Sequence, residues 1–88
     1  IPMIYKNDAS ALDKAKKIYD ELKDKGIDVL LDDVEENISN KFKKHDLLGI
    51  PFQIIIGSKA TNENIEFKEI DKNSEMLNLN QIIKILKN

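Results

Sequence analysis

An amphipathic helical pattern between two short apolar runs is the feature that most constrains the fold of this chain. Its apolar residues recur every three or four positions and form one stripe: Leu12, Ala15, Ile18, Tyr19 and Leu22. Gly26 follows as the left-handed residue that ends many helices. The apolar runs 1–5 and 27–32 on either side predict strands. A strand, a helix and a strand this close in sequence predict a βαβ unit with parallel strands and a right-handed crossover.

A second, shorter helix is predicted after this unit. Ile38, Phe42 and His45 share one helical face. Gly49 ends the pattern, and Pro51 cannot extend it because proline lacks the backbone N–H that a helix needs.

The remaining patterns predict that the sheet continues and that a helix closes the chain. Phe52–Ile56 is apolar on both faces, as a central strand should be. Segment 65–70 suits a strand with one solvated face, and segment 76–78 suits a short edge strand. A final apolar stripe, which Asn78 is expected to cap, contains Leu79, Ile82, Ile83 and Leu86. We therefore expect residues 1–88 to form one domain, an α/β sandwich of three helices and four or five strands.

The composition narrows the class of protein. A chain of 88 residues buries roughly 60–65% of its unfolded surface, which allows one modest core but no deep active-site cleft with a lid. The absence of cysteine excludes disulfides and thiolate metal sites. No apolar run approaches the roughly 18 residues of a membrane span, and the start of the chain lacks a signal-peptide pattern. We therefore expect a cytoplasmic protein without membrane contact.

The charge balance bears on the partners of the chain. The formal net charge is −2, with an isoelectric point near 5.4. Taken alone, this disfavours nucleic-acid binding, because domains that bind phosphate tend to be basic. All 14 basic residues are lysines. The chain therefore lacks the planar guanidinium that pairs bidentately with phosphate or guanine.

Acidic and basic side chains gather between the second and third predicted strands, at an edge where open α/β sheets usually bind ligands. Asp32 and Asp33 end a strand and begin a loop. Paired carboxylates could hold a divalent cation or accept hydrogen bonds from base amino groups. In the simpler alternative, one caps the next turn and the other is solvated. Lys41, near the start of the following helix, could contact phosphate or a base edge, whereas Lys43 and Lys44 fit an ordinary solvated face.

No pattern in the chain points to catalysis. A general base needs a nucleophile or an orienting partner within reach, and the sequence shows none for His45, the single histidine. Zinc would need further nitrogen or sulfur ligands. We therefore expect His45 to pack partly on the sheet. Gly57-Ser58-Lys59 lacks the longer glycine-rich span of a phosphate-binding loop.

Several of these segments together resemble the anticodon-binding domain of class II aminoacyl-tRNA synthetases. They are Asp32-Asp33, Lys41-Phe42, Asp46-Leu47-Leu48-Gly49-Ile50-Pro51 and Ile54-Ile55-Ile56-Gly57. The pattern is most similar to prolyl-tRNA synthetases of bacterial type, in which an Asp-Asp pair, a Lys-Phe pair and Asp-Leu-Ile-Gly-Ile-Pro are characteristic. The resemblance covers essentially the whole chain, and its joint pattern is more specific than any single piece.

The resemblance implies a three-layer α/β/α sandwich whose mixed sheet of four to five strands has the order 2-1-3-4-5. It also implies that the chain grips the anticodon loop of a tRNA, tRNA-Pro for a prolyl enzyme. A separate catalytic domain, absent from these residues, would activate the amino acid with ATP and magnesium, so no cofactor is expected on this domain. The chain would then be a fragment of a homodimeric, cytoplasmic ligase, although it carries no catalytic site of its own.

The resemblance also assigns candidate RNA contacts. Asp33, Glu36 and Lys41 would contact bases or backbone, and Asp32 would shape the end of the strand. Phe42 would stack on a base or join the core, since splayed single-stranded bases are stacked on aromatic rings.

Three positions depart from the family pattern and keep alternatives open. Val34 stands where the family has arginine after Asp-Asp, Ser39 where it has glycine, and Ile70 where an arginine is often found. Val34 cannot pair with guanine, for which arginine is the commonest bidentate reader. The alternatives are a glycyl- or threonyl-type anticodon domain, and an anticodon-fold accessory or protein-interaction module that does not read tRNA.

Overall fold

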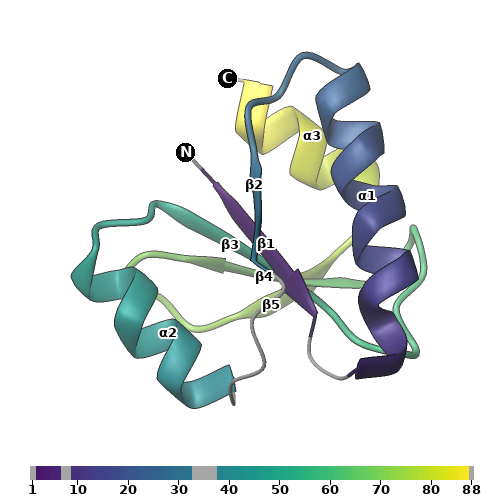
Figure 1. Ribbon diagram of the computed structural model, residues 1–88. Coiled ribbons are helices and arrows are strands. Elements are labelled where there is room, and N and C mark those ends of the chain that lie inside the picture. The colour runs from purple at the N-terminus through teal and green to yellow at the C-terminus, as the bar shows by residue number, and fades with distance from the viewer. Residues whose placement is uncertain (1, 7–8, 33–37, 88) are drawn as a thin grey trace.

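The computed structural model describes residues 2–6, 9–32 and 38–87, which form a mixed sheet between two helical layers (Figure 1). One layer holds α1 (Leu12–Asp24), which a 3-10 turn (Ala9–Ala11) precedes, and α3 (Leu79–Lys87); the other holds α2 (Ile38–Leu47). The strands are β1 (Met3–Lys6), β2 (Leu30–Asp32), β3 (Phe52–Ile56), β4 (Ile65–Glu69) and β5 (Glu75–Leu77). The predicted three-layer α/β/α architecture is confirmed.

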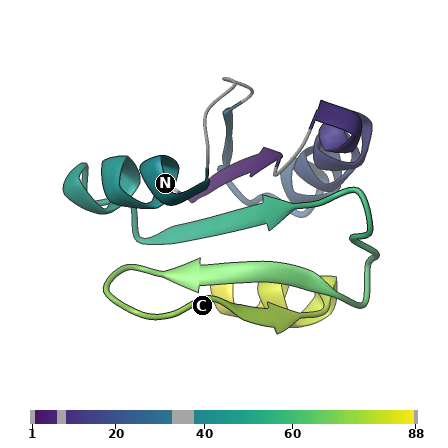
Figure 2. The ribbon, with the colours of Figure 1, turned by 90° about the horizontal axis from the view of Figure 1, so that it is seen from below.

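The strand order in the sheet is β2-β1-β3-β4-β5, as the family resemblance implied. β1 lies between β2 and β3 and is parallel to both, whereas β4 is antiparallel to β3 and β5. Figure 2 shows the opposite directions of β3 and β4. The predicted βαβ unit is therefore present as β1, α1 and β2, with the helix as the crossover between parallel strands.

The main hydrophobic core lies between the sheet and the layer of α1 and α3. Ile4, Ile54 and Phe67 stand in register on β1, β3 and β4, and all three are buried. From α1 they meet the predicted stripe, of which Ala15, Ile18 and Leu22 are buried; Leu79 and Ile82 of α3 join the same cluster.

The opposite face of the sheet, under α2, is far more polar. Because side chains alternate between faces along a strand, the neighbours of the core residues point toward α2. They include Tyr5 on β1, Gln53 on β3 and Lys68 on β4, and all three are buried. Gln53 and Lys68 are paired in register, so the sequence places two adjacent polar groups under this helix.

Strand β2 is shorter than the predicted span 27–32. Ile27 and Val29 are buried as strand residues would be, but they make no ladder with β1. The ladder begins where the N–H of Leu30 donates to the carbonyl of Pro2 at 3.0 Å. Pro2 has no N–H to offer in return, and proline characteristically stands at strand ends for this reason.

The first two helices end two residues before the glycines that were expected to end them, α1 at Asp24 and α2 at Leu47. Gly26 and Gly49 have φ values of +80° and +76°, in the left-handed region that glycine adopts without a steric penalty. Among the described residues, no helix is both long and apolar enough to cross a membrane.

Candidate nucleic-acid interface

The predicted site lies at the edge of the sheet where the parallel strands β2, β1 and β3 all end. β2 ends at Asp32, and α2 begins at Ile38 on the polar face of the sheet. Asp33 and Glu36, two of the predicted contacts, lie outside the described residues. The structure does place the other three candidates, Asp32, Lys41 and Phe42, and they come together beside this edge.

Asp32 lies against two side chains from successive turns of α2, Lys41 and His45. Its Oδ1 lies 3.6 Å from Lys41 Nζ, and its Oδ2 lies 3.3 Å from His45 Nε2. The side chain of Asp32 is only 10% exposed, and those of Lys41 and His45 are 0% and 2% exposed. We call these three residues the Asp32 ion cluster. It connects the end of β2 to α2, and the role of Asp32 in shaping the strand end stays a prediction.

Lys41 is fully buried, which the sequence did not predict. Its Nζ lies 4.9 Å from the ring centroid of Tyr5, within the range of a cation–π contact. Among the described polar side chains, this Nζ is buried without a hydrogen-bond partner. The structure gives Lys41 a role in holding Asp32, and its direct contact with RNA stays a prediction.

Phe42 is half-buried beside the same cluster. Its ring meets that of Tyr5 edge to face, with centroids 6.5 Å apart, and the Nζ of Lys68 lies 5.4 Å from its centroid. Phe42 therefore packs on the sheet and keeps part of its surface accessible, so both predicted roles, base stacking and core packing, remain consistent with its position.

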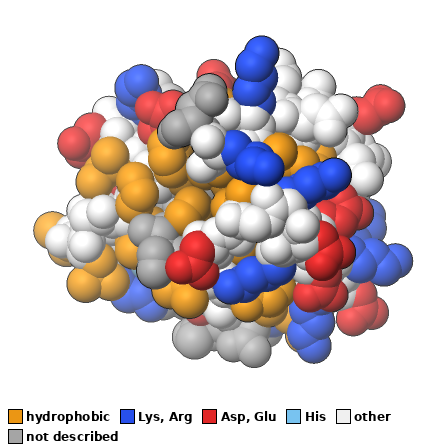
Figure 3. Space-filling view, turned by 90° about the horizontal axis from the view of Figure 1, so that it is seen from above, with side chains coloured by type: hydrophobic (Ala, Val, Ile, Leu, Met, Phe, Trp, Pro, Cys, Tyr) orange, Lys and Arg blue, Asp and Glu red, His pale blue; other side chains and the backbone are white. Residues whose placement is uncertain are grey.

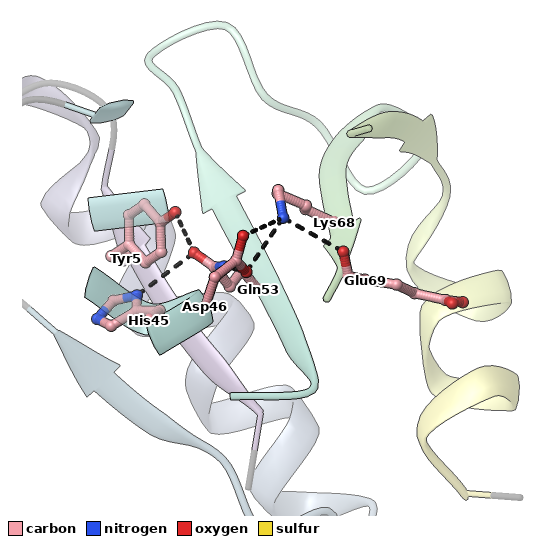
Figure 4. A network of polar contacts seen from close by, with 6 residues as sticks. All are labelled: Tyr5, His45, Asp46, Gln53, Lys68 and Glu69. Atoms are coloured by element: carbon pink, nitrogen blue, oxygen red, sulfur yellow. Dashed lines mark hydrogen bonds and ion pairs between the residues drawn. The ribbon is translucent and has the colours of Figure 1, made fainter. Parts of the chain in front are cut away.

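A second set of polar contacts continues from His45 across β1, β3 and β4 (Figure 4). The hydroxyl of Tyr5 donates to Gln53 Oε1 at 2.7 Å, and His45 Nδ1 lies 3.3 Å from the same oxygen. The Nε2 of Gln53 donates to Asp46 Oδ1 at 3.2 Å. Lys68 Nζ donates to both carboxylate oxygens of Asp46, at 3.2 and 3.1 Å. We call these five residues the Gln53 network.

The phenol of Tyr5 stays protonated in this setting. Burial is the main cause that raises the pKa of Tyr5 far above its ordinary value, and the negative charges of Glu66, Asp32 and Asp46 raise it further. Tyr5 therefore acts as a hydrogen-bond donor to Gln53 throughout the physiological range of pH.

Sequence reasoning missed most of this network. His45 does pack on the sheet as expected, but it has orienting partners that the sequence did not reveal. One signal was available: Lys41 and His45 are four residues apart and so share a helical face. The other was Gln53, a polar residue inside an otherwise apolar strand, since a buried amide needs partners.

A hollow lies on the same face of the sheet beside this cluster. Asp32 on β2, Tyr5 on β1, Ile55 on β3 and Glu66 on β4 are neighbours in register across the sheet. Ile55 and Glu66 also line the hollow. Its volume is about 160 Å³, and the residues that line it are Ile55, Gly57, Lys59, Ala60, Asn64, Glu66 and Met76. Glu66 offers acceptors, and Lys59 and Asn64 offer donors, so the hollow can pair with polar groups of a ligand.

Figure 3 looks from above, whereas α2 lies at the bottom of Figure 1; on the face that Figure 3 shows, lysine and acidic side chains are interspersed among hydrophobic ones. Ser39, Asn40 and Lys43 on α2 are exposed. No three His, Cys, Asp or Glu side chains of the described residues are grouped so that they could hold a metal ion. The fold and this site therefore define a small α/β/α binding domain, with its polar groups at one edge of the sheet.

Comparisons with known proteins identify the family. The chain matches the model of the anticodon binding domain over residues 1–88. It is 51% identical over 86 residues to a proline–tRNA ligase of Pelagibacter ubique, in a match that covers 98% of this chain and 19% of that protein. It is 41% identical over 81 residues to the proline–tRNA ligase of Fusobacterium nucleatum, covering 92% of this chain and 14% of that protein.

Solved structures agree on the fold. The RNA-binding domain of threonyl-tRNA synthetase from Cryptosporidium parvum superposes with a TM-score of 0.84 at 24% identity, over 98% of this chain and 22% of that one. Histidyl-tRNA synthetase from S. aureus superposes with a TM-score of 0.74 at 27% identity, over 99% of this chain and 23% of that one. The chain belongs to the anticodon-binding domain family, and it spans about a fifth or less of the two proline–tRNA ligases above.

Proposed function

We propose that this chain recognises the anticodon of tRNA-Pro as the anticodon-binding domain of a proline–tRNA ligase. The observation that carries the proposal is the match of the family model over residues 1–88, together with 51% identity to a proline–tRNA ligase. Relatives at 37% to 51% identity, from organisms that include Rippkaea orientalis, Rickettsia bellii and Trichormus variabilis, are proline–tRNA ligases, which favours this proposal over the glycyl and threonyl alternatives.

The chemistry of the sheet edge suits single-stranded bases. Proteins read such bases by hydrogen bonds to their Watson–Crick edges and by stacking. Guanine presents N–H donors on that edge, and proline anticodons carry two guanines. Carboxylates accept from N–H donors. Asp33 and Glu36 are therefore the proposed base contacts, with Asp32 as the fixed point that precedes them and Phe42 as the aromatic surface nearby.

The proposal extends to the rest of the protein. A separate catalytic domain, which these residues do not include, would bind ATP and magnesium and attach proline to the tRNA. We infer that this domain is the intramolecular partner of the chain and that the complete ligase is a cytoplasmic homodimer. This domain itself would hold no cofactor.

A second candidate function is an anticodon-fold module that binds protein rather than tRNA. The observation that favours it is the absence of arginine from the chain, including at Val34 and Ile70. The coding region upstream of Ile1 distinguishes the two candidates, because a class II catalytic core there supports the ligase.

Titration of the ¹⁵N-labelled chain with an anticodon stem–loop of tRNA-Pro tests the proposal. We expect amide shifts concentrated in residues 32–44, and weaker binding for the matched stem–loop in which both guanines of the anticodon are replaced by adenine. Shifts that avoid residues 32–44 would refute the site, whatever the affinity. Equal affinity for the two stem–loops would refute recognition of the anticodon.

A further inference from the structure

The connection between β3 and β4 forms much of the hollow beside the predicted RNA site. Four of the residues that line the hollow belong to this connection: Gly57, Lys59, Ala60 and Asn64. Lys59 is exposed and brings a cation to this edge of the sheet. The backbone course of the connection therefore decides where Lys59 and the rim of the hollow lie.

The connection consists of two backbone turns, 57–60 and 61–64, each closed by a hydrogen bond between its ends. The second turn is tied to α3, because the N–H of Leu79 donates to the carbonyl of Asn62 at 2.7 Å. The first turn, which carries Lys59, is held from a different helix.

Lys14 on α1 holds the first turn. Its Nζ donates to the carbonyl of Ala60 at 3.2 Å and also to the carbonyl of Ser58. Hydrogen bonds from an ionised donor are stronger than those between neutral groups. The two acceptors flank Lys59 in the sequence, so one ammonium contacts the backbone on both sides of this residue. Figures 1 and 2 show the connection running beside the N-terminal part of α1.

Open space lies on both sides of this turn. A cavity of about 260 Å³ is lined by residues of α1 and of the connection, among them Lys14, Ile18 and Ala60. Ala60 also lines the hollow, so the turn forms a wall between the two spaces. Lys14 extends its aliphatic stem along the apolar cavity and places its ammonium on the turn, as long cationic side chains commonly do. Because side chains do not fill these spaces, the position of the turn depends strongly on the bonds of Lys14.

We propose that Lys14 is a positioning residue for RNA recognition, which holds turn 57–60 so that Lys59 and the hollow face the RNA. The inference rests on the proposed function. It extends the site to the other helical layer, because Lys14 belongs to α1, whereas the Gln53 network lies under α2. Loss of the ammonium removes two hydrogen bonds to the turn and lets it adopt further conformations, which weakens the contact that Lys59 makes.

Substitution of Lys14 in the 88-residue chain tests the proposal. Lys14→Met keeps most of the stem and removes the donor. We expect the affinity for a labelled anticodon stem–loop of tRNA-Pro, measured by fluorescence anisotropy, to fall about fivefold, which corresponds to the net contribution of one hydrogen bond. Lys14→Arg should bind within about twofold of the unmodified chain, because a guanidinium keeps donors for both carbonyls.

Lys17→Met is the matched control for charge. Lys17 is an exposed lysine one turn further along α1, and it lines the same cavity. Its substitution removes the same charge from the same helix and should leave the affinity for the stem–loop nearly unchanged. Circular dichroism and urea denaturation of both variants verify that the fold is retained.

A double-mutant cycle separates positioning from direct contact. If Lys14 acts through the turn that carries Lys59, Lys14→Met should have little further effect in a chain that already carries Lys59→Gln. A direct contact of Lys14 with phosphate would instead give effects that add. Amide spectra of the free chain provide a readout without RNA: Lys14→Met should shift the signals of residues 58–60, and Lys17→Met should leave them in place.

The outcomes separate the two proposals. RNA affinity that Lys14→Met leaves unchanged, or that Lys17→Met lowers equally, overturns the positioning role and leaves the proposed function intact. Additive effects of Lys14→Met and Lys59→Gln, or unshifted signals of residues 58–60, do the same. RNA that fails to bind the unmodified chain overturns the proposed function, and the positioning role with it.

Discussion

At the scale of single residues, the burial of Lys41 gives this charged side chain a structural role. The sequence suggested that Lys41, near the start of its helix and close to the acidic loop, could contact phosphate or a base edge. Lysine is almost never fully buried without a partner. In the structure Lys41 compensates the charge of Asp32 from inside the domain, between α2 and the ring of Tyr5. Its contribution is thus expected in stability first and in RNA binding through the position of Asp32.

The substitution Lys41→Met tests this role. It keeps the volume of the side chain and removes the buried charge, so Asp32 loses its ion pair with Lys41. We expect a loss of about 2 kcal/mol in the free energy of unfolding, below the range for a buried charge that loses its only partner. Urea denaturation followed by circular dichroism measures it.

The matched control for Lys41 is Lys43→Met on the exposed face of α2. A surface substitution of this kind is expected to change stability by no more than about 0.5 kcal/mol. Equal effects of the two substitutions would contradict the buried ion pair with Asp32.

At the scale of secondary-structure elements, α3 shows how local chemistry defines a helix. Asn78 caps its start: the N–H of Gln81 donates to Asn78 Oδ1 at 2.7 Å, and Gln81 Oε1 accepts from the N–H of Asn78 at 3.0 Å. These reciprocal bonds satisfy two backbone donors that a helix start leaves free. The cap expected from the sequence is thereby confirmed, together with its partner Gln81.

We expect Asn78→Ala to cost about 1 kcal/mol of unfolding free energy, because it removes the side-chain acceptor of the cap. The control Asn80→Ala lies two residues further along the same helix at an exposed position. It should be neutral or slightly stabilising, since alanine has the higher helix propensity. Thermal melts of both variants measure the difference, and a cap without energetic importance would make them equal.

The elements predicted well are those that local sequence determines. The stripe of α1 and the glycine after it belong to one continuous segment, so periodicity identifies the helix and Gly26 its end. The length of β2 depends instead on its partner β1, and the neighbouring Pro2 limits the ladder. The Gln53 network needs the register of three strands against α2, which no single segment encodes.

At the scale of the whole molecule, the two faces of the sheet differ in polarity. The face of the sheet under α1 and α3 carries the apolar core, and the face under α2 carries the polar groups of the site. The main apolar core and the proposed ligand contacts therefore lie on different sides of one small sheet. The family resemblance predicted the three layers and the strand order, whereas the polar face and the contacts of Asp32 required the packed side chains.

The net charge of the whole chain leads to the last prediction. A net charge of −2 and the interspersed charges on the face shown in Figure 3 leave little general attraction to phosphate. For single-stranded nucleic acid, each neutralised phosphate contributes about 0.7 to the slope of log affinity against log salt. We expect the slope for the tRNA-Pro stem–loop to be no steeper than about −2, and the affinity of the chain alone to be weak. Anisotropy between 50 and 200 mM salt, about the range in which such slopes are compared, measures it.

Two lysines provide the matched comparison for this slope. Lys59 is exposed and lines the hollow beside the site, whereas Lys84 is exposed on α3 in the opposite helical layer. Lys59→Gln should make the slope shallower by about 0.7, the share of one phosphate contact, and Lys84→Gln should leave it unchanged. A slope of about −5 or steeper, or equal effects of the two substitutions, would contradict recognition led by base contacts at this edge, since it would mean that phosphate attraction spread over the surface dominates binding.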